Sequence, residues 1–486
     1  MTSILDSEPF DGPVWLASVP VVCLVVLLST SVYLFGDNSS YGPNQIALLF
    51  AAGIAQVIGI RVGWKALQDA MVESIGIAMT ACLILLMVGM LIGVWMLCGT
   101  APTLMYYGLG LLDPGLFYPA SCLICALVAM TIGSSWSTAG TLGIALIGIA
   151  SVLGLSLEIT AGAIISGAYF GDKLSPLSDT TNLASGVAGI DLFDHIRYML
   201  WTTLPAMTLA LLLYTLLALN TDIGQTQDSD VLATRAALAQ HYQIGLIPLL
   251  PLLLILVMAA RGIPAYPTLA AGSIAGVVIA LTYQRDAVLL FGDPTQTLSV
   301  TEALVRAVWQ AMGNGFSLTS GNQALDTLLS RGGMSSMLNT VWLIISAMVF
   351  GSAMERTGML RRLVEAILKG VRSIGSLVTA TVITCVGINI LSGDQYMSIV
   401  LPGRMFRLEY RRQGLDSANL SRTLEDAGTM TSALIPWNTC GAFMAATLGV
   451  PTSGYAMFAF LNLMTPLFAI GYALMDFRIQ RLQPAS

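Results

Sequence analysis

The chain has 486 residues, of which 56% are hydrophobic and only 10% are charged, and its formal net charge is −6. A soluble domain carries about 25% charged residues, so a soluble protein, a disordered chain and a disulfide-stapled secreted domain are excluded. The acidic balance and the lack of a basic block exclude nucleic acid as a partner. What remains is an all-α polytopic membrane protein with roughly 10–13 membrane segments of about 20 residues each.

The first apolar run, Val14 to Phe35, follows an acidic start without Lys or Arg. Such a start is the reverse of a secretory signal, so we expect this run to stay in the bilayer. Several of the later runs are too short to cross alone. The candidate segments are 14–35, 45–60, 73–97, 116–133, 138–156, 159–170, 195–218, 244–260, 264–284, 334–354, 374–391, 395–408 and 455–476.

Interruptions inside these runs predict broken or re-entrant helices at Gly133, Gly171, Gly393 and Pro436. Two polar stretches, 219–243 and 285–333, are the sizeable loops, and the second contains a candidate amphipathic helix, TEALVRAVWQAM. We therefore divide the chain into a first membrane repeat (1–218), a polar linker (219–243) and a second membrane repeat (244–486).

An internal repeat supports this division. When the chain is shifted by about 219 residues against itself, the AAG at 51–53 aligns with the AAG at 270–272. The order of the matches along both halves predicts a repeat of about 200 residues. Under an ungapped shift of 257 residues the matching pairs are Ser135 with Ser392, Thr141 with Ser398, Gly171 with Gly428, Ser175 with Ser432 and Leu177 with Leu434.

The positive charges predict how the halves are oriented. Ten Lys or Arg residues lie between 356 and 422, whereas the matching stretch 99–165 has none. Because short loops rich in Lys and Arg stay cytoplasmic, this asymmetry predicts two inverted-topology repeats, as in many secondary transporters. The basic residues Arg61, Lys65, Arg478 and Arg481 place both termini in the cytoplasm.

Polar clusters interrupt the apolar sequence at corresponding places in the two halves. One is SGAYFGDKLSPLSDTTNLASG, starting at residue 166, and the other is EDAGTMTSALIPWNTCGA, starting at residue 425. A smaller pair is GSSWSTAGT and GINILSGDQYMS. A carboxylate at the bilayer centre costs about 2.5–3.5 kcal/mol even on lenient scales, so it needs a cavity, a partner or an ion. Hydroxyl, amide and carboxylate oxygens beside broken helices suit a hard cation such as Na+.

Simpler structural roles compete for some of these residues. A lone Ser or Thr in a membrane helix usually bonds to its own turn or to a neighbouring helix. Lys173 could form a plain ion pair with Asp172, and the adjacent charged residues Glu355–Arg356 and Glu425–Asp426 are expected at the water interface. Cys122 and Cys125 have CxxC spacing but lie in an apolar run, so we interpret them as packing residues, and we expect no transition-metal site.

The chain resembles the NhaC-type sodium/proton antiporters of bacteria, which belong to the ion transporter superfamily. The resemblance implies Na+/H+ exchange in a bacterial cytoplasmic membrane, with the lipid bilayer, Na+ and H+ as partners and a homodimer left open. In related carboxylate transporters a Ser-Asn-Thr element coordinates sodium; Thr181-Asn182 and Asn438-Thr439 resemble it without matching fully. The similar segments are GTAPTLMYYGL, GSSWSTAGTLGIALIG, GAYFGDKLSPLSDTTNLA, SGDQYMSIVLPGRMF and NLSRTLEDAGTMTSALIPWNTCGAFM.

Antiport needs a group that holds either Na+ or a proton. A buried carboxylate can do this, because desolvation favours its protonated form while Na+ favours its ionised form. We predict Asp179 as this group, with Asp172 and Asp394 as reserves. The further ion-binding candidates are Ser175, Ser178, Thr180, Thr181, Asn182, Asn438 and Thr439, and the supporting candidates are Ser135, Ser137, Lys173 and Trp437.

Two other functions fit parts of the pattern. A sodium- or proton-coupled transporter of organic anions such as malate or lactate, or of amino acids, would use Lys173 and Asn438 as substrate anchors. An intramembrane aspartyl protease would use the pairs Gly171-Asp172 and Gly393-Asp394, but a paired-aspartate site needs a second motif that we do not find. We therefore expect a transporter without a cofactor rather than an enzyme.

Overall fold

The computed structural model describes residues 10–36, 39, 41–220, 228–318, 326 and 329–482. These residues form helices joined by turns and loops, and one isolated β-bridge joins Leu415 to Arg481. The all-α prediction is confirmed. The helices in chain order are α1 (Val14–Phe35), α2 (Pro43–Ile58), η3 (Ile60–Val62), α3 (Trp64–Leu97), α4 (Thr100–Leu111), η4 (Pro114–Leu116), α5 (Phe117–Ile132), α6 (Ser135–Thr138), η5 (Ala139–Gly143), α7 (Ile144–Val152), α8 (Leu157–Leu174), α9 (Asp179–Ala188), α10 (Leu192–Asn220), α11 (Asp228–His241), η6 (Ile247–Leu249), α12 (Leu250–Ala260), α13 (Ala265–Tyr283), α14 (Arg285–Gly292), α15 (Val300–Gly313), η7 (Met334–Met337), α17 (Leu338–Arg356), α18 (Met359–Leu368), α19 (Ile374–Ser392), α20 (Gln395–Arg412), α21 (Ser417–Leu424), η8 (Glu425–Thr429), α22 (Met430–Ser432), α23 (Thr439–Leu448), α24 (Thr452–Tyr455), η9 (Ala456–Phe458) and α25 (Phe460–Leu474).

Within the described ranges, eight helices are long and apolar enough to cross a bilayer. A ninth span results if Thr452–Phe458 and Phe460–Leu474, which are bent by 55° at their junction, are counted together. This number is lower than the 10–13 predicted segments, because several apolar runs form helices such as Pro43–Ile58 and Ile247–Ala260 that are too short to pass as full spans. The protein is a multi-pass membrane protein.

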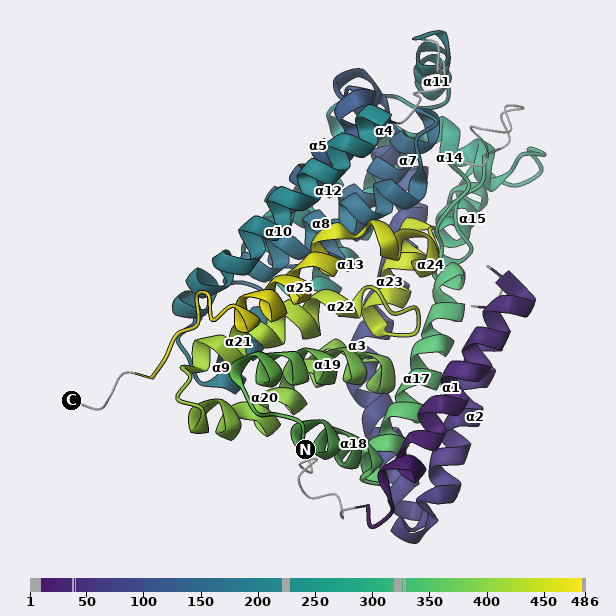
Figure 1. Cartoon of the computed structure of the whole chain (residues 1–486). Helices are drawn as coiled ribbons and strands as arrows, with labels where there is room; N and C mark the ends of the chain where they lie inside the picture. The colour runs from purple at the N-terminus through teal and green to yellow at the C-terminus, as the bar shows by residue number, and fades with distance from the viewer. Residues whose placement is uncertain are drawn as a thin grey trace.

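The helix pair α1 and α2 packs on α17 at one edge of the molecule, and α10 lies near the opposite edge with α5 (Figure 1). Helices α12 and α13 pack against each other, and α13 contacts α3. The predicted polar linker (219–243) contains α11, and residues 221–227 of the linker lie outside the described residues. The predicted amphipathic helix is α15, which a capping box of Ser299 and Glu302 starts. Figure 1 places α11 and α14 at the end of the molecule opposite α18.

Three of the four predicted helix breaks are present. Gly133 and Gly393 end α5 and α19 with φ of 74° and 66°, a left-handed conformation that glycine adopts without strain. Pro436 lies in the turn between α22 and α23. The fourth prediction is wrong, because Gly171 lies inside α8, which continues to Leu174.

Gly171 serves helix packing instead. With Gly167 it forms a GxxxG spacing, which lets helix backbones approach closely. A Cβ atom on Gly167 would lie 2.0 Å from the carbonyl oxygen of Cys122, and one on Gly171 would lie 2.3 Å from that of Ala126. Both glycines therefore hold α8 directly against the backbone of α5. Cys122 and Cys125 are fully buried in the core of this contact region, as packing residues should be.

Helix ends recur 260 residues apart in two stretches of the chain. The span Pro114–Ile132 corresponds to Ile374–Ser392, Ser135–Val152 corresponds to Gln395–Arg412, and Asp179–Ala188 corresponds to Thr439–Leu448. The capping residues follow the same spacing. They are Asp113 and Ser373, Gly133 and Gly393, Ser134 and Asp394, Ser156 and Asp416, Ser178 and Asn438, and Gly189 and Gly449.

The register of the repeat is thus three residues longer than the shift of 257 found in the sequence. Three residues are close to one helical turn, so apolar residues of one helix face still match after such a slip. In the corrected register Ser135 corresponds to Gln395, not to Ser392, and Asp172 corresponds to Ser432. The residues that correspond to Thr141, Gly171, Ser175 and Leu177 likewise lie three positions further along the chain than the shift of 257 indicated.

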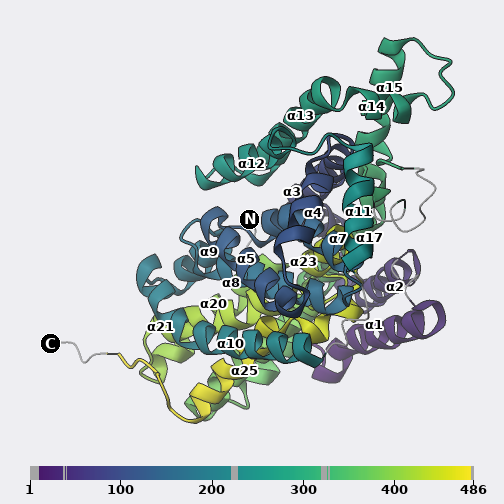
Figure 2. The ribbon, with the colours of Figure 1, turned by 90° about the horizontal axis from the view of Figure 1, so that it is seen from above.

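The buried apolar residues form two clusters, and the smaller one joins the two repeats. Ala184 and Ala188 of α9 pack with Leu377, Phe406 and other residues of α19, α20 and α21. Figure 2 shows α9 beside α20 and α21, although α9 precedes them by about two hundred residues in the chain. The short helix after the first polar cluster is therefore held within the core of the second repeat.

The close contact of α8 and α5 gives a testable prediction. Gly171→Ala should lower the free energy of unfolding by about 1–3 kcal/mol, because the new methyl group meets backbone atoms that cannot yield. In Gly76→Ala of α3, the new Cβ has no atom within 4 Å. This substitution should raise the free energy of unfolding by about 0.5–1 kcal/mol. Reversible unfolding in mixed micelles, followed by circular dichroism, measures both. Equal effects of the two substitutions would contradict the packing role.

Candidate functional site

The first polar cluster lies where α8 ends and α9 begins. Ser175 caps the C-terminus of α8, and the Ser178 hydroxyl accepts a hydrogen bond from the Thr181 N–H as the N-cap of α9. The Thr181 hydroxyl donates to the Lys173 carbonyl, 3.0 Å away. Pro176, which has no N–H, lies in the turn between the helices. These contacts keep the chain broken at this point.

Asp172 is buried beside the N-terminus of another short helix. Its Oδ2 accepts a hydrogen bond of 3.0 Å from the Ser135 N–H, at the start of α6. Helix N-termini favour negative charge. The side chain of Ser178 also interacts with this carboxylate. The other oxygen, Oδ1, is buried and forms no hydrogen bond with any residue of the described ranges.

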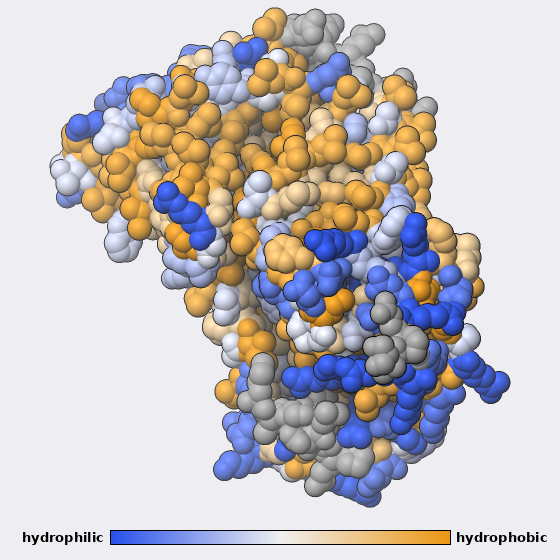
Figure 3. All heavy atoms as spheres, turned by 90° about the vertical axis from the view of Figure 1, so that its left-hand side faces the viewer, coloured by the Kyte–Doolittle hydropathy of each residue, from blue (hydrophilic) through white to orange (hydrophobic). Residues whose placement is uncertain are grey.

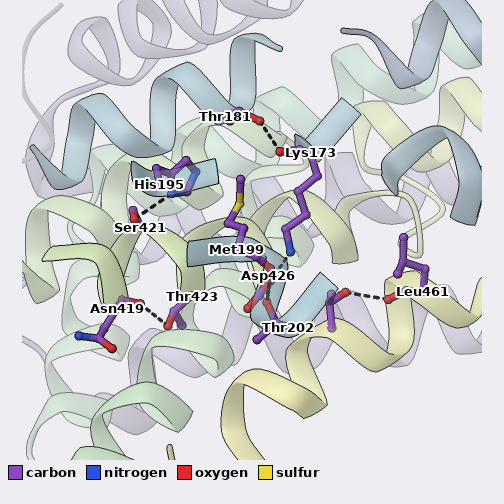
Figure 4. A network of polar contacts seen from close by, with 11 residues as sticks. Lys173, Thr181, His195, Met199, Thr202, Asn419, Ser421, Thr423, Asp426 and Leu461 are labelled. Carbon is purple, nitrogen blue, oxygen red and sulfur yellow. Dashed lines mark hydrogen bonds and ion pairs between the residues drawn. The ribbon is translucent and has the colours of Figure 1, made fainter. Parts of the chain in front are cut away.

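Lys173 pairs with an acid from the other repeat. Its ammonium group contacts Asp426, and both side chains are completely buried. The Thr202 hydroxyl of α10 donates to the same Asp426 oxygen over 3.0 Å, so three elements meet at this carboxylate (Figure 4). The alternative role considered for Lys173, a plain ion pair with Asp172, is therefore not the one found in the structure. Sequence neighbours on a helix point in different directions, and Lys173 reaches across to η8 instead.

Glu425 and Asp426 are fully buried, which contradicts their expected place at the water interface. They begin η8, a π-helical turn of 425–429. Such π-turns often occur at functional sites. Both Glu425 oxygens and Asp426 Oδ2 are buried and form no hydrogen bond of normal geometry with a described residue, although the hydroxyl groups of Thr429 and Thr180 interact with Glu425. Glu425 lies within electrostatic reach of Lys173 and Asp172.

We call Asp172, Lys173, Glu425 and Asp426 the carboxylate cluster. It contains three buried carboxyl groups and one buried ammonium group, contributed by α8 and η8. If all three acids are ionised, two negative charges are left uncompensated by the side chains of the cluster. Uncompensated charges in a low-dielectric interior cost several kcal/mol each, so this arrangement is suited to bind a cation or protons.

Asp179, the predicted carrier, is exposed rather than buried. It is the first residue of α9, and the Tyr396 hydroxyl of α20 donates a hydrogen bond to its Oδ2. Its place in the first helical turn turns the side chain away from the core. Asp172, named as a reserve, is the buried carboxylate of this hairpin, with only 5% of its surface exposed.

The other candidates of the first hairpin have mixed roles. Thr180 is buried, interacts with Glu425 and bonds to Ser178 over 3.1 Å. Asn182 is exposed, and its amide group donates to the carbonyls of Pro176 and Ser178. Asn182 therefore fastens the turn, in the way asparagine side chains commonly do.

The second polar cluster, at the turn before α23, contains a contact between the side-chain amides of Asn389 and Asn438. Asn438 is the N-cap of α23, accepts from the Cys440 N–H and donates to Asn389 Oδ1 over 3.0 Å. Buried Thr439 donates its backbone N–H to the Gly393 carbonyl, 2.8 Å away. Asp394 is the N-cap of α20 and accepts from the Met397 N–H.

The supporting residues Ser135, Ser137 and Trp437 are placed around the helix ends. Ser135 and Ser137 are buried in α6, and the Ser137 N–H bonds to Ser134. The Trp437 indole donates to the Ile390 carbonyl over 2.7 Å. Trp437 thus fixes the turn before α23.

The first turn of α20 contacts both polar clusters, the one between α8 and α9 and the one that runs from η8 to α23. Tyr396 contacts Asp179, while the neighbouring Gln395 contacts Ser432 and Cys440. On the other side, Trp136 of α6 stacks on Phe443 of α23, with ring centroids 4.1 Å apart. The predicted segments 178–182 and 438–439 therefore belong to one connected polar region, through intermediate residues.

The ion pair of Lys173 and Asp426 gives a second prediction. Lys173→Met should lower the free energy of unfolding by about 3–5 kcal/mol, because it leaves Asp426 buried and unpaired. The double variant Lys173→Met/Asp426→Leu should regain most of this loss. As a control, Arg197→Met removes an exposed ion pair with Asp194. It should change the free energy of unfolding by less than about 1 kcal/mol. A double variant as unstable as the single one would contradict the pairing.

Comparison with known proteins identifies the family of the chain. Residues 167–477 match the model of the Na+/H+ antiporter family. The chain is 39% identical to the Na(+)/H(+) antiporter NhaC of Alkalihalophilus pseudofirmus over 88% of each chain. It is 38% identical to the arginine/ornithine antiporter ArcD of Halobacterium salinarum, over 96% of this chain and 93% of the relative. It is 37% identical to a malate-2H(+)/Na(+)-lactate antiporter of Bacillus subtilis, over 93% and 92% of the two chains. The chain belongs to the Na+/H+ antiporter family and is a secondary antiporter rather than an enzyme.

Proposed function

We propose that the protein exchanges Na+ for H+ across the bacterial cytoplasmic membrane, with the carboxylate cluster as the shared site. The observation that carries this proposal is the charge balance of three buried carboxyl groups against one buried lysine. Because Lys173 is engaged by Asp426, Asp172 and Glu425 are the acids that need another positive charge. A sodium ion or protons can each supply it, and occupation by one disfavours the other.

In this proposal Asp172 is the central ligand, and the oxygens of Ser178 and Thr180 complete its surroundings. Na+ takes oxygen ligands as other hard cations do, and the unpartnered oxygens of Asp172 and Glu425 are available for it. Asp179, exposed and bonded to Tyr396, acts as an outer acid that cations meet before the buried cluster. Alternating access then exposes the cluster to each side in turn.

The relatives make organic substrates the second candidate. An organic anion needs a positive anchor, and the best one in the sequence was Lys173, which is paired and buried in this structure. A cationic amino acid suits the negative cluster better. The charge balance therefore favours a cation, either Na+ or a cationic amino acid, over malate or lactate.

Transport in proteoliposomes tests the proposal. Na+ added against a pH gradient should collapse the gradient in the wild-type protein, whereas malate, lactate, arginine or ornithine should not. Asp172→Asn and Glu425→Gln should each weaken apparent Na+ affinity by about 10–100-fold, the expected effect of losing a charged ligand worth about 1.5–3 kcal/mol. Asp179→Asn should have a smaller effect, because its carboxylate is exposed.

Glu158→Gln is the matched control for these variants. Glu158 is a carboxylate of the same helix as Asp172, but it lies at the helix start and bonds to Ser156. Its removal should leave exchange unchanged. Normal Na+/H+ exchange by Asp172→Asn and Glu425→Gln would refute the site, and exchange driven by an organic substrate alone would favour the second candidate.

We further propose that the two repeats are inverted and that both termini face the cytoplasm. Phe10 and Asp11 line a pocket with Arg361 and Arg362 of α18. At the other end of the chain, Leu415 follows the basic end of α20 and pairs with Arg481. Both described ends thus lie beside basic segments, which favour the cytoplasmic side. The homodimer stays a prediction.

Labelling of introduced cysteines tests this orientation. In inside-out vesicles a membrane-impermeant thiol reagent should react with Lys65→Cys, which follows η3, and should not react with Gln296→Cys, near α14 at the opposite end. Intact cells should give the reverse pattern. Most native cysteines are buried, and only Cys23 is partly accessible, so Cys23→Ser provides the background. Reaction of both sites from the same side would contradict the orientation.

A further inference from the structure

A groove between α9 and α20 carries two arginines that the transport site does not use. Arg404 and Arg407 of α20 form one wall, and the other consists of Asn182, Leu183, Gly186 and Val187 of α9. The cavity has a volume of about 380 Å³. It brings positive charge and apolar side chains to one place on the surface.

Neither arginine has an acidic partner in the described parts of the chain. None of the ion pairs between described residues includes Arg404 or Arg407. The Arg407 Nε is buried and has no hydrogen-bond acceptor among the residues that the structure describes. Its guanidinium lies against Gly189, where a Cβ atom would be only 2.6 Å from Nη2. The end of α9 therefore leaves room for the Arg407 side chain, and no acid of the described residues forms an ion pair with it.

The surroundings of the groove are those of a membrane boundary. Leu183 and Val187 line it, and Leu408 beside Arg407 is 66% exposed. Figure 3 faces the side of the molecule on which Figure 1 draws α9, α20 and α21, and it shows a broad hydrophobic surface above a zone rich in hydrophilic side chains. A ligand here could keep a charged group in the polar zone and apolar chains along the hydrophobic surface.

We propose that this groove binds the phosphate group of an anionic glycerophospholipid, with the lipid chains along Leu183 and Val187. Arginine binds phosphate oxygens through several N–H groups at once, and basic pockets on the cytoplasmic side of membrane proteins suit anionic headgroups. The lipid would join α9 of the first repeat to α20 of the second, close to the bridge of Asp179 and Tyr396. The proposal does not depend on which substrate is transported.

Thermal unfolding of the purified protein in neutral detergent tests the proposal. Short-chain phosphatidylglycerol should raise the unfolding midpoint by about 2–4 °C, as expected for a ligand that binds only the folded state. Short-chain phosphatidylcholine and inorganic phosphate at the same concentration should not. R404Q/R407Q should lose the effect. The matched control R411Q/R412Q removes two charges one turn further along α20, outside the groove, and should keep it.

Two results would overturn the proposal. If R411Q/R412Q loses the phosphatidylglycerol-induced rise of the unfolding midpoint as fully as R404Q/R407Q does, the rise reflects general surface charge. If inorganic phosphate raises the midpoint as much as phosphatidylglycerol does, the groove is a site for free anions. If the double variant does not fold, R404Q alone decides, because Arg404 is exposed and its removal disturbs no packing. It should lose a large part of the shift, and an unchanged shift in R404Q would count against the groove.

Discussion

Burial of charge inside a membrane protein is the constraint on which this structure depends. Lys173 and Asp426 are fully buried and can persist only as a pair. Asp172 obtains part of its compensation from the N-terminus of α6, through the Ser135 N–H. Glu425 has only the nearby hydroxyl groups of Thr429 and Thr180 and forms no hydrogen bond of normal geometry with a described residue. The side chains of the carboxylate cluster therefore do not balance one another in charge, and in the proposed function a bound cation or protons supply the missing positive charge.

The helix breaks exist to meet this constraint. An unbroken helix satisfies its own N–H groups and has none to offer a carboxylate, whereas α6 and α20 begin inside the protein. The repeat uses the two starts differently: the cap of α6 is Ser134 and the nearby acid is Asp172, whereas the cap of α20 is the acid Asp394 itself. The residue corresponding to Asp172 is Ser432. At positions 260 residues apart, acid and serine have thus exchanged places: Ser134 and Asp172 correspond to Asp394 and Ser432.

Much of this could be predicted from the sequence, for reasons that differ between features. The helical class, the breaks at Gly133, Gly393 and Pro436 and the polar region around Asp172 follow from apolar runs and their interruptions, which are local signals. The packing role of Gly171 was missed, because a glycine that breaks a helix and one that packs against a neighbour look alike when each is taken alone. The GxxxG spacing with Gly167 was the available signal.

Long-range pairing was the larger gap. Nothing in the sequence joins Lys173 to Asp426, which is 253 residues away, and the nearer Asp172 was the natural partner to expect. Glu425 and Asp426 resembled interfacial acids because charged residues usually are; the π-turn that carries them inward has no reliable sequence signal. Conversely, Asp179 was expected to be buried because its polar neighbours are, although the first turn of a short helix points its residues in several directions.

The pair of Lys173 and Asp426 also limits how the protein can move. Separating α8 from η8 would leave two unpaired charges in the interior, so a transport movement that pulled them apart would cost several kcal/mol. Helix α10 is tied to the same point through Thr202, and α9 is held in the core of α19, α20 and α21. These elements must therefore move together and carry the site with them. The outer helices α1, α2, α12 and α13 contribute no residue to the carboxylate cluster, so this ion pair does not tie them to η8.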